Sequence, residues 1–175
     1  MTETTDELDL ADAALVRAAQ GGDTLALNDL LDRLSPYVAR ICGPIALVSG
    51  PDAAQDALIA VLRALPALRE PAALWGWVRT IAVREAVRHA TRDMRAQPLD
   101  TDMLNELPTR DDPQLRTDVR AVLDRLTPHH RAVLVLRDLE GMDETSVATV
   151  LDLPVGTIKS RLHRARRLFR KEWTA

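Results

Sequence analysis

Apolar residues recur at steps of three and four along most of the chain, which is the spacing of one face of an α-helix. In the amino-terminal half this pattern predicts four helices, at about residues 11–19, from 24 onward, 52–65 and 73–92. Gly21-Gly22, Gly50-Pro51 and the pair Pro66 and Pro71 separate them. Residues 37–41 either continue the second helix past Pro36 or form a separate or kinked segment.

The carboxyl-terminal half shows the same spacing. Thr127-Pro128 is a helix start, with Thr as N-cap and Pro at the first helical position, and this helix ends at Gly141. Asp143 caps a second helix, and the turn Asp152-Leu153-Pro154 leads into a third. Since no stretch alternates with a period of two, the predicted fold class is all-α.

Charge divides the chain into three parts. Residues 1–98 have a net charge of −3, residues 99–115 of −4 and residues 116–175 of +4, although the whole chain is only −3. The middle part contains two prolines and no useful helical period, so we expect an extended acidic linker. The predicted organisation is two small helical domains, at 1–96 and 115–175, joined by a linker at 97–114.

The last predicted helix has the strongest chemical signal. Residues 155–171 contain seven Lys or Arg and no acid, whereas the apolar residues Ile158, Leu162, Ala165 and Phe169 fall on one face. Such a helix packs inward and presents positive charge to an anionic partner. With the preceding turn, and with the small Ala148, it resembles the second helix of a helix-turn-helix, which enters the DNA major groove. An ordinary αα-hairpin with a charged face is the alternative.

Within that helix we expect two kinds of DNA contact. Lys159, Ser160, His163 and Arg164 share the outward face near the amino terminus, where recognition-helix side chains reach base edges. The other arginines are placed to contact phosphates, which set register rather than sequence; they are Arg161, Arg166, Arg167 and Arg170.

A second basic stripe lies in the amino-terminal domain. Arg84, Arg88, Arg92 and Arg95 follow one another at helical spacing. Either they form a solvated face of a bundle helix or they track phosphates. Trp75 and Trp77 leave a similar choice between core anchors and base-stacking groups, and at least one is expected in the core.

Composition excludes several classes of protein. Cys42 is the only cysteine, so no intramolecular disulfide can form, and it is expected to be a small core residue. The histidines have no partners at zinc-ligand spacing, so no metal or cofactor is expected. The acidic amino terminus is no signal peptide, and no apolar run approaches membrane-spanning length, which favours a cytoplasmic protein that contacts no membrane. No carboxylate forms a motif with His or Cys, and we expect no enzymatic activity.

The run LTPHHRAVLVLRDLEGMDETSVATVLDLPVGTIKSRLHRARRLFRK closely resembles region 4 of bacterial sigma-70-type initiation factors of the extracytoplasmic-function (ECF) group. LVRAAQGGDTLALNDLLDRLSPYVARI, DAAQDALIAVLRAL and LWGWVRTIAVREAVRHATR resemble region 2 of the same group. The resemblance implies a promoter-specificity subunit of RNA polymerase that recognises −35 and −10 elements and helps to melt the promoter.

The resemblance also implies residue roles. Lys159, Ser160, His163 and Arg164 would read the −35 element, with Arg161 and Arg167 on its phosphates. Arg84 and Arg88 would face DNA at the −10 element, and the loop 66–73 would hold a flipped base. Asp52, Gln55 and Asp56 would meet the clamp helices of the polymerase β′ subunit. Further implied partners are the β flap and an anti-sigma factor.

Two other hypotheses remain open at this point. A stand-alone helix-turn-helix regulator would bind DNA without polymerase and would use its amino-terminal half for dimerisation or sensing. A helical partner-binding module would not touch DNA, although the uninterrupted positive charge of residues 155–171 argues against it.

Overall fold

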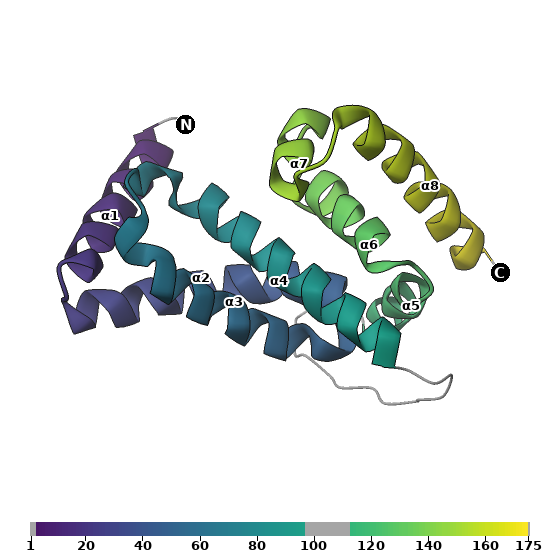
Figure 1. Ribbon diagram of the computed structural model, residues 1–175, viewed down its shortest axis with the longest axis horizontal. Coiled ribbons are helices and arrows are strands. Elements are labelled where there is room, and N and C mark those ends of the chain that lie inside the picture. Colours follow the sequence, from purple (N-terminus) through teal and green to yellow (C-terminus); the bar gives the residue numbers. More distant parts are fainter. Residues whose placement is uncertain (1–2, 97–112, 175) are drawn as a thin grey trace.

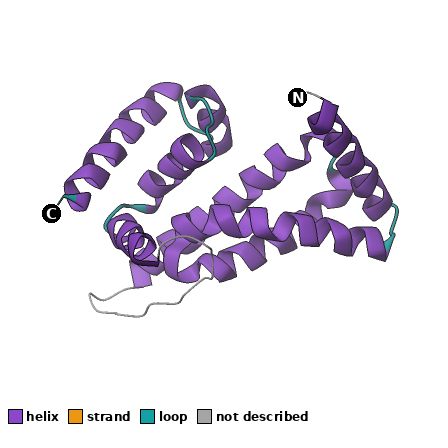
Figure 2. Ribbon diagram, turned by 180° about the vertical axis from the view of Figure 1, so that it is seen from behind, coloured by secondary structure: helices purple, strands orange, loops and turns teal. Residues whose placement is uncertain are grey.

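A computed structural model describes residues 3–96 and 113–174, with side chains described for residues 12–96 and 118–174. Every regular element in these residues is helical and none is a strand (Figure 2), so the all-α prediction is confirmed. The helices are α1 (Glu3–Gln20), α2 (Thr24–Ala46), α3 (Gly50–Ala64), α4 (Leu74–Ala96), α5 (Pro113–Asp124), α6 (Pro128–Leu134), α7 (Glu144–Leu151) and α8 (Val155–Trp173).

Helices α1 to α4 form the amino-terminal bundle. Of the apolar positions at helical spacing, Leu30, Leu34, Val78 and Ala82 are buried in its core, whereas Leu27, Leu31, Trp77 and Ile81 are half-buried. Helix α2 continues through Pro36 and Pro44 as one element. Each proline removes a backbone donor, but a buried stripe on both sides of Pro36 holds the helix together. Helix α1 also begins earlier than expected, at Glu3.

A polar contact inside this bundle joins three helices. Asp12 is buried, and its carboxylate accepts hydrogen bonds from Arg33 at 2.7 Å and from the Trp75 indole at 2.9 Å. The Trp75 ring also meets Tyr37 edge to face, with ring centroids 5.1 Å apart. Trp75 is therefore a core anchor, as the sequence predicts for at least one tryptophan.

Cys42 lies in the same core, which confirms its prediction as a small buried residue. Its thiol lies 3.5 Å from the Ala82 carbonyl oxygen. Burial, with a smaller contribution from Glu85, raises the pKa of the thiol to about 12. A thiol that stays protonated at neutral pH is a poor nucleophile and a poor metal ligand.

The expectation that no run approaches membrane-spanning length is wrong. Within the helical run Thr24–Ala67, an 18-residue window has a mean hydropathy of 1.4, long and apolar enough to cross a membrane. Half of that window is buried in the protein, and Leu30, Leu34 and Val38 are in the bundle core. This apolarity is that of a core helix.

Helices α5 to α8 form the carboxyl-terminal domain. Thr127 accepts a hydrogen bond from the His130 backbone N–H, as its prediction as an N-cap requires, and a π-helical turn, Val135–Leu139, extends α6. Helix α5 was not predicted. The expected linker, residues 97–114, lies outside the described residues except for Pro113 and Gln114, which begin α5.

The two domains pack against each other. Helices α6 and α7 contact α4, and α6 also contacts α2, so they lie between α4 and α8 (Figure 1). One buried cluster runs from Val16 and Leu34 of the amino-terminal bundle to Leu136 and Ile158 of the carboxyl-terminal domain. The sequence predicts two domains but not this shared core.

Candidate nucleic-acid interface

The turn between α7 and α8 sets the direction of α8. Asp143 begins α7 by accepting hydrogen bonds from the Thr145 and Ser146 backbone N–H groups, each at 2.9 Å. Asp152 ends it in the left-handed conformation, with φ 53° and ψ 52°. The Leu153 backbone N–H then donates to the Ala148 carbonyl oxygen at 3.0 Å. This is the tight helix-turn-helix geometry predicted from the sequence, with Asp in the left-handed position.

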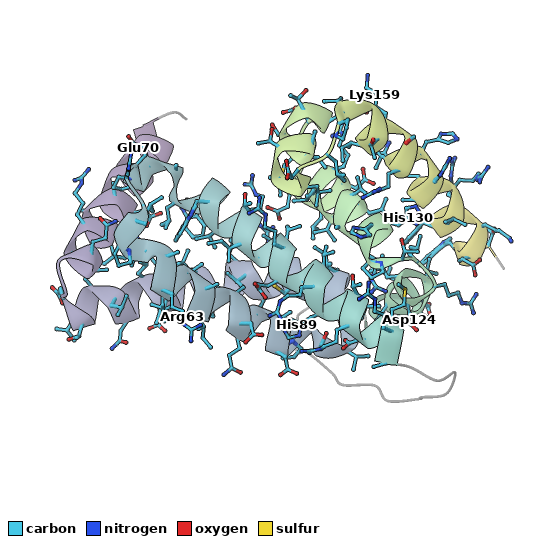
Figure 3. The ribbon with its side chains drawn as sticks, viewed as in Figure 1. Arg63, Glu70, His89, Asp124, His130 and Lys159 are labelled. Atoms are coloured by element: carbon cyan, nitrogen blue, oxygen red, sulfur yellow. The ribbon has the colours of Figure 1, made fainter. Side chains whose placement is uncertain are left out.

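Helix α8 is buried on one face and exposed on the other. Ile158, Leu162 and Ala165 are buried, as predicted, whereas Phe169 of the same face is half-buried. On the opposite face the exposed residues include Lys159, Ser160, His163, Arg164 and Arg167, whereas Arg161 is half-buried. Figure 3 shows Lys159 pointing away from the bundle at the start of α8.

Some basic side chains of α8 already have partners within the protein. Arg166 pairs with Asp138 of the π-helical turn, and Lys159 Nζ lies 3.8 Å from a Glu144 carboxylate oxygen. Among the described residues, no acidic group within 4.0 Å holds Arg164 or Arg167. These two exposed guanidinium groups are therefore available to anions, while Arg166 is committed to its own domain.

The second basic stripe lines a shallow groove on α4. Arg84, Arg88, Arg92 and Arg95 lie along it together with Val87 and Thr91. Their exposure confirms that the four arginines share one solvent-facing side of α4. The groove is thus a positively charged surface about three helical turns long.

The predicted polymerase-contact residues lie on α3, next to that stripe. Asp52 and Gln55 are exposed and Asp56 is half-buried. One oxygen of Asp56 lies 2.9 Å from the Arg88 guanidinium and 2.8 Å from His89 Nε2. These hydrogen bonds, that of His89 first, lower the pKa of the Asp56 carboxyl. A residue predicted to bind polymerase is therefore paired with one predicted to bind DNA.

Asp56, Glu85 and His89 place one potential ligand atom each within 4.8 Å of one another, as a metal site would. However, Arg88 hydrogen-bonds to both carboxylates. A guanidinium in this position supplies the positive charge that a metal ion would otherwise bring. The cluster is an ion-pair network, and its residues do not fit a metal centre.

Two protein-family models match this chain, one in each of its two helical domains. The family model described as Sigma-70 region 2 matches residues 27–96, and the one described as Sigma-70, region 4 matches residues 116–169. The chain belongs to the sigma-70 family. Region 2 thus coincides with α2 to α4, and region 4 with α5 to α8.

Its relatives lie in the ECF group of that family. The chain is 32% identical to the ECF RNA polymerase sigma-E factor of Escherichia coli (strain K12), over 90% of this chain and 91% of the relative. It is 30% identical to the Haemophilus influenzae factor of the same name, over 91% of this chain and 93% of that one.

Two solved structures share the fold. One is the sigma factor RpoE in complex with the anti-sigma factor NepR from Bartonella quintana, with a TM-score of 0.69 and 19% identity over 85% of this chain and 97% of that one. The other is CnrH in complex with the cytosolic domain of CnrY, with a TM-score of 0.63 and 24% identity over 92% and 96%.

A side chain of α1 holds the region 2 loop between α3 and α4. The sequence did not predict this contact. The Gln20 amide donates to the carbonyl oxygens of Leu65 and Leu68, both at 2.8 Å. Arg69 and Glu70 are exposed beyond these anchors, and Figure 3 shows Glu70 at that end of the bundle. The only sequence signal was a polar residue at the carboxyl end of an apolar helix.

Region 4 also contains an apolar groove that was not predicted. Its apolar lining comes from α5, α6, the π-helical turn and α8 and includes Val119, Leu123, Leu134, Leu139 and Phe169. Leu139 is 51% exposed and adds to the apolar surface of the groove. The border of the groove is charged with both signs: Lys159, Arg166 and Arg170 lie there together with Asp138 and Glu144.

Proposed function

We propose that this chain is the promoter-specificity subunit of a bacterial RNA polymerase, with α8 at the −35 element and α4 at the −10 element. The observation that supports this best is the exposed basic face of α8 behind a helix-turn-helix turn, in a chain that also contains sigma region 2. The subunit acts in the cytoplasm and catalyses no reaction.

At the −35 element, the amino-terminal half of α8 enters the major groove. Lys159 and Arg164 donate to guanine acceptors, and Ser160 and His163 make shorter polar contacts with base edges. Arg161 and Arg167 neutralise phosphates and set the register. Arg166 was also expected on a phosphate, but its pairing with Asp138 favours a structural role.

At the −10 element, Arg84 and Arg88 hold the DNA while the α3–α4 loop receives an extruded base. Unstacking a base costs a few kcal/mol. A small set of contacts with the pocket and with phosphates offsets a free energy of about this size. Trp75 cannot supply stacking there without breaking its hydrogen bond to Asp12, so polar and backbone groups of the loop hold the base.

Polymerase contacts occupy two further surfaces. Asp52, Gln55 and Asp56 on α3 meet the β′ clamp helices. The region 4 groove takes an apolar helix of the β flap, since the groove lies between helices and its lining is largely apolar. A sigma factor of the same fold was solved in complex with an anti-sigma factor, which supports an anti-sigma partner for this chain as well.

Run-off transcription with purified core polymerase tests the proposal. Core polymerase with this chain should start at defined sites on genomic fragments, and core polymerase alone should not. No promoter-specific transcript would overturn it. Tight, specific binding of the isolated chain to a palindrome would instead favour a stand-alone regulator.

Arg164→Ala should remove selectivity at the −35 element. Losing one base contact of this kind reduces discrimination by about 1–3 kcal/mol. The measurement is competition between promoters with intact and altered −35 sequences. Arg17→Ala, which removes an exposed arginine at the end of α1, is the matched control and should leave promoter choice unchanged. Unchanged choice with Arg164→Ala would contradict the assignment of α8.

A further inference from the structure

His89 of α4 is a buried polar side chain that the proposed function leaves without a role. It is 2% exposed. Its Nε2 lies 2.8 Å from a carboxylate oxygen of Asp56 on α3, and its Nδ1 lies 2.9 Å from a terminal nitrogen of Arg92, one turn further along α4. Arg92 lines the groove of the second basic stripe. The imidazole therefore links a side chain of α3 to the basic groove of α4.

The two partners of His89 determine which ring nitrogen carries the proton. The Arg92 guanidinium has only donors, so Nδ1 accepts with its lone pair. In a neutral ring the proton then lies on Nε2, which donates to Asp56. Asp56 suits this role, because its hydrogen bonds, that of His89 first, keep the pKa of its carboxyl below the usual value. Arg88 lies 3.4 Å from the same Nε2, but a nitrogen that donates cannot accept from it. Both ends of the ring thus fit one neutral tautomer.

Arg92 and Arg88 are held in different ways. The Arg88 guanidinium pairs with the carboxylates of Glu85 and Asp56, which balance its charge within the protein. Arg92 is held by an uncharged imidazole. Within 4.0 Å of Arg92 the described part of the chain places one carboxylate, that of Asp93, at 4.0 Å, and the Arg92 side chain is 59% exposed. Arg92 is therefore oriented without losing its charge to a neighbour.

An oriented, charged guanidinium suits a phosphate. The bond to His89 Nδ1 needs only one of the N–H groups of Arg92, so the others remain available. Two of them can bind a phosphate through parallel hydrogen bonds. A flexible arginine loses rotamer freedom when it binds, and a contact that orders it beforehand removes part of that cost. His89 therefore prepares Arg92 for an anion in the groove.

We propose that His89 is a positioning residue of the −10 surface, whose Nδ1 directs the Arg92 guanidinium toward a phosphate of promoter DNA in the α4 groove. The identity of the anion rests on the proposed function, whereas the contact of His89 with Arg92 belongs to the chain alone. Arg92 then joins Arg84 and Arg88 as DNA contacts of α4. Asp56 gains a second task, because it fixes the ring from the α3 side.

Nitrogen-15 NMR of the histidine rings tests the contact in the free, full-length chain. At neutral pH His89 should have an unprotonated Nδ1 and a protonated Nε2, and its signals are assigned by their loss in His89→Gln. In Arg92→Ala the Nδ1 signal should shift, because its hydrogen bond is lost. A proton on Nδ1, or an Nδ1 signal that Arg92→Ala leaves in place, would overturn the contact.

Promoter binding by core polymerase with the full chain tests the phosphate contact. Arg92→Ala should make the slope of log affinity against log salt shallower by about 0.9, the value for one phosphate contact with duplex DNA. Arg17→Ala, which removes an exposed arginine at the end of α1, is the control and should leave the slope unchanged. An unchanged slope with Arg92→Ala would rule out the phosphate contact.

A double-mutant cycle separates positioning from a merely structural effect. His89→Gln keeps a donor near the place of Nε2 but offers no acceptor at Nδ1. It should weaken promoter binding by about two- to tenfold, the range for ordering one long side chain on binding. In an Arg92→Ala background the same change should have no effect. His89→Asn, which keeps an oxygen near the place of Nδ1, should retain most of the wild-type affinity.

The positioning role is wrong if His89→Gln causes equal losses in both backgrounds, or if His89→Asn binds as weakly as His89→Gln. Failure of the proposed function gives a different result. Core polymerase with the wild-type chain would then bind no promoter, and the phosphate contact of Arg92 would fall with it. The NMR signals would still decide whether His89 orients Arg92.

Discussion

At the scale of single residues, Arg88 is the side chain whose partners differ most between the free and the proposed bound states. In the free chain its guanidinium is shared between Glu85 and Asp56. Asp56 is also proposed to face the polymerase clamp. If the clamp takes Asp56, Arg88 loses one of its two carboxylates and becomes freer to contact DNA. Polymerase binding and DNA binding would then be coupled through one exposed ion pair.

Arg88→Ala should weaken the contact with DNA but leave the stability of the fold nearly unchanged. Promoter opening, measured with a fluorescent base at the −10 element, should fall by about tenfold, since a charge-assisted contact is lost. The melting temperature should hardly change, because exposed ion pairs contribute little to folding. Arg17→Ala is the control for removing an exposed arginine. A large fall in melting temperature with normal opening would mean that Arg88 is only structural.

His130 should make region 4 sensitive to acid. Partial burial and the nearby Arg161 and Arg164 guanidinium groups lower the pKa of His130 below its usual 6.5. The unfolded chain therefore binds a proton at a higher pH than the folded domain does, so the free energy of unfolding is highest above pH 6.5 and falls as the pH drops through that value. Below the folded-state pKa the loss levels off.

Urea unfolding of the full chain between pH 8 and pH 5 measures this effect. His130→Gln should flatten the fall below pH 6.5. His163→Gln removes an imidazole from the exposed face of α8 and controls for the loss of a histidine. If wild type and His130→Gln show the same pH dependence, the depressed pKa of His130 does not contribute to stability.

At the scale of helices, sequence alone predicted the elements whose signals are local. The N-caps Thr127 and Asp143, the left-handed Asp152 and the buried stripe of α8 are all encoded within a few neighbouring residues. Helix α5 was missed although Val119, Val122 and Leu123 have helical spacing, because the acidic, proline-containing segment predicted as linker runs into its first turn. Its packing against α8 and Leu47 is a tertiary contact that no local pattern shows. The continuity of α2 through Pro36 depends likewise on packing against other helices, which outweighs local propensity.

Asp152→Val should test the turn that aims α8. A β-branched residue tolerates the left-handed conformation poorly, and the change should lower the free energy of unfolding by about 1–2 kcal/mol. Asp152→Gly serves as the control, because glycine adopts the left-handed conformation without strain. It should lower the free energy of unfolding far less or not at all. Chemical denaturation of both variants provides the values. Equal destabilisation by Val and Gly would mean that the Asp152 side chain matters more than its backbone angle.

At the scale of the whole molecule, the sequence predicted two domains but could not predict how they meet. Arg40, Arg79 and Glu140 are charged residues on helix surfaces, and in a sequence they look the same as solvated ones. One carboxylate oxygen of Glu140 lies 2.9 Å from Arg40 and the other 3.7 Å from Arg79. Their meeting depends on three-dimensional proximity between α2, α4 and the end of the π-helical turn. The DNA-reading residues were easier to find, because a basic face on one helix is a local pattern.

The shared core predicts how the free chain unfolds. Because one buried cluster spans both domains, and Glu140 and Arg131 each lose partners in region 2 when the domains part, neither domain should melt independently. Differential scanning calorimetry of the wild type should show one transition, with equal calorimetric and van't Hoff enthalpies. In Glu140→Gln the domains should uncouple into two transitions, the less stable at a lower temperature, while Glu172→Gln, which removes an ion pair with Arg125 inside region 4, keeps one. Two separate transitions in the wild type would show that the contacts between the domains are too weak to couple their unfolding.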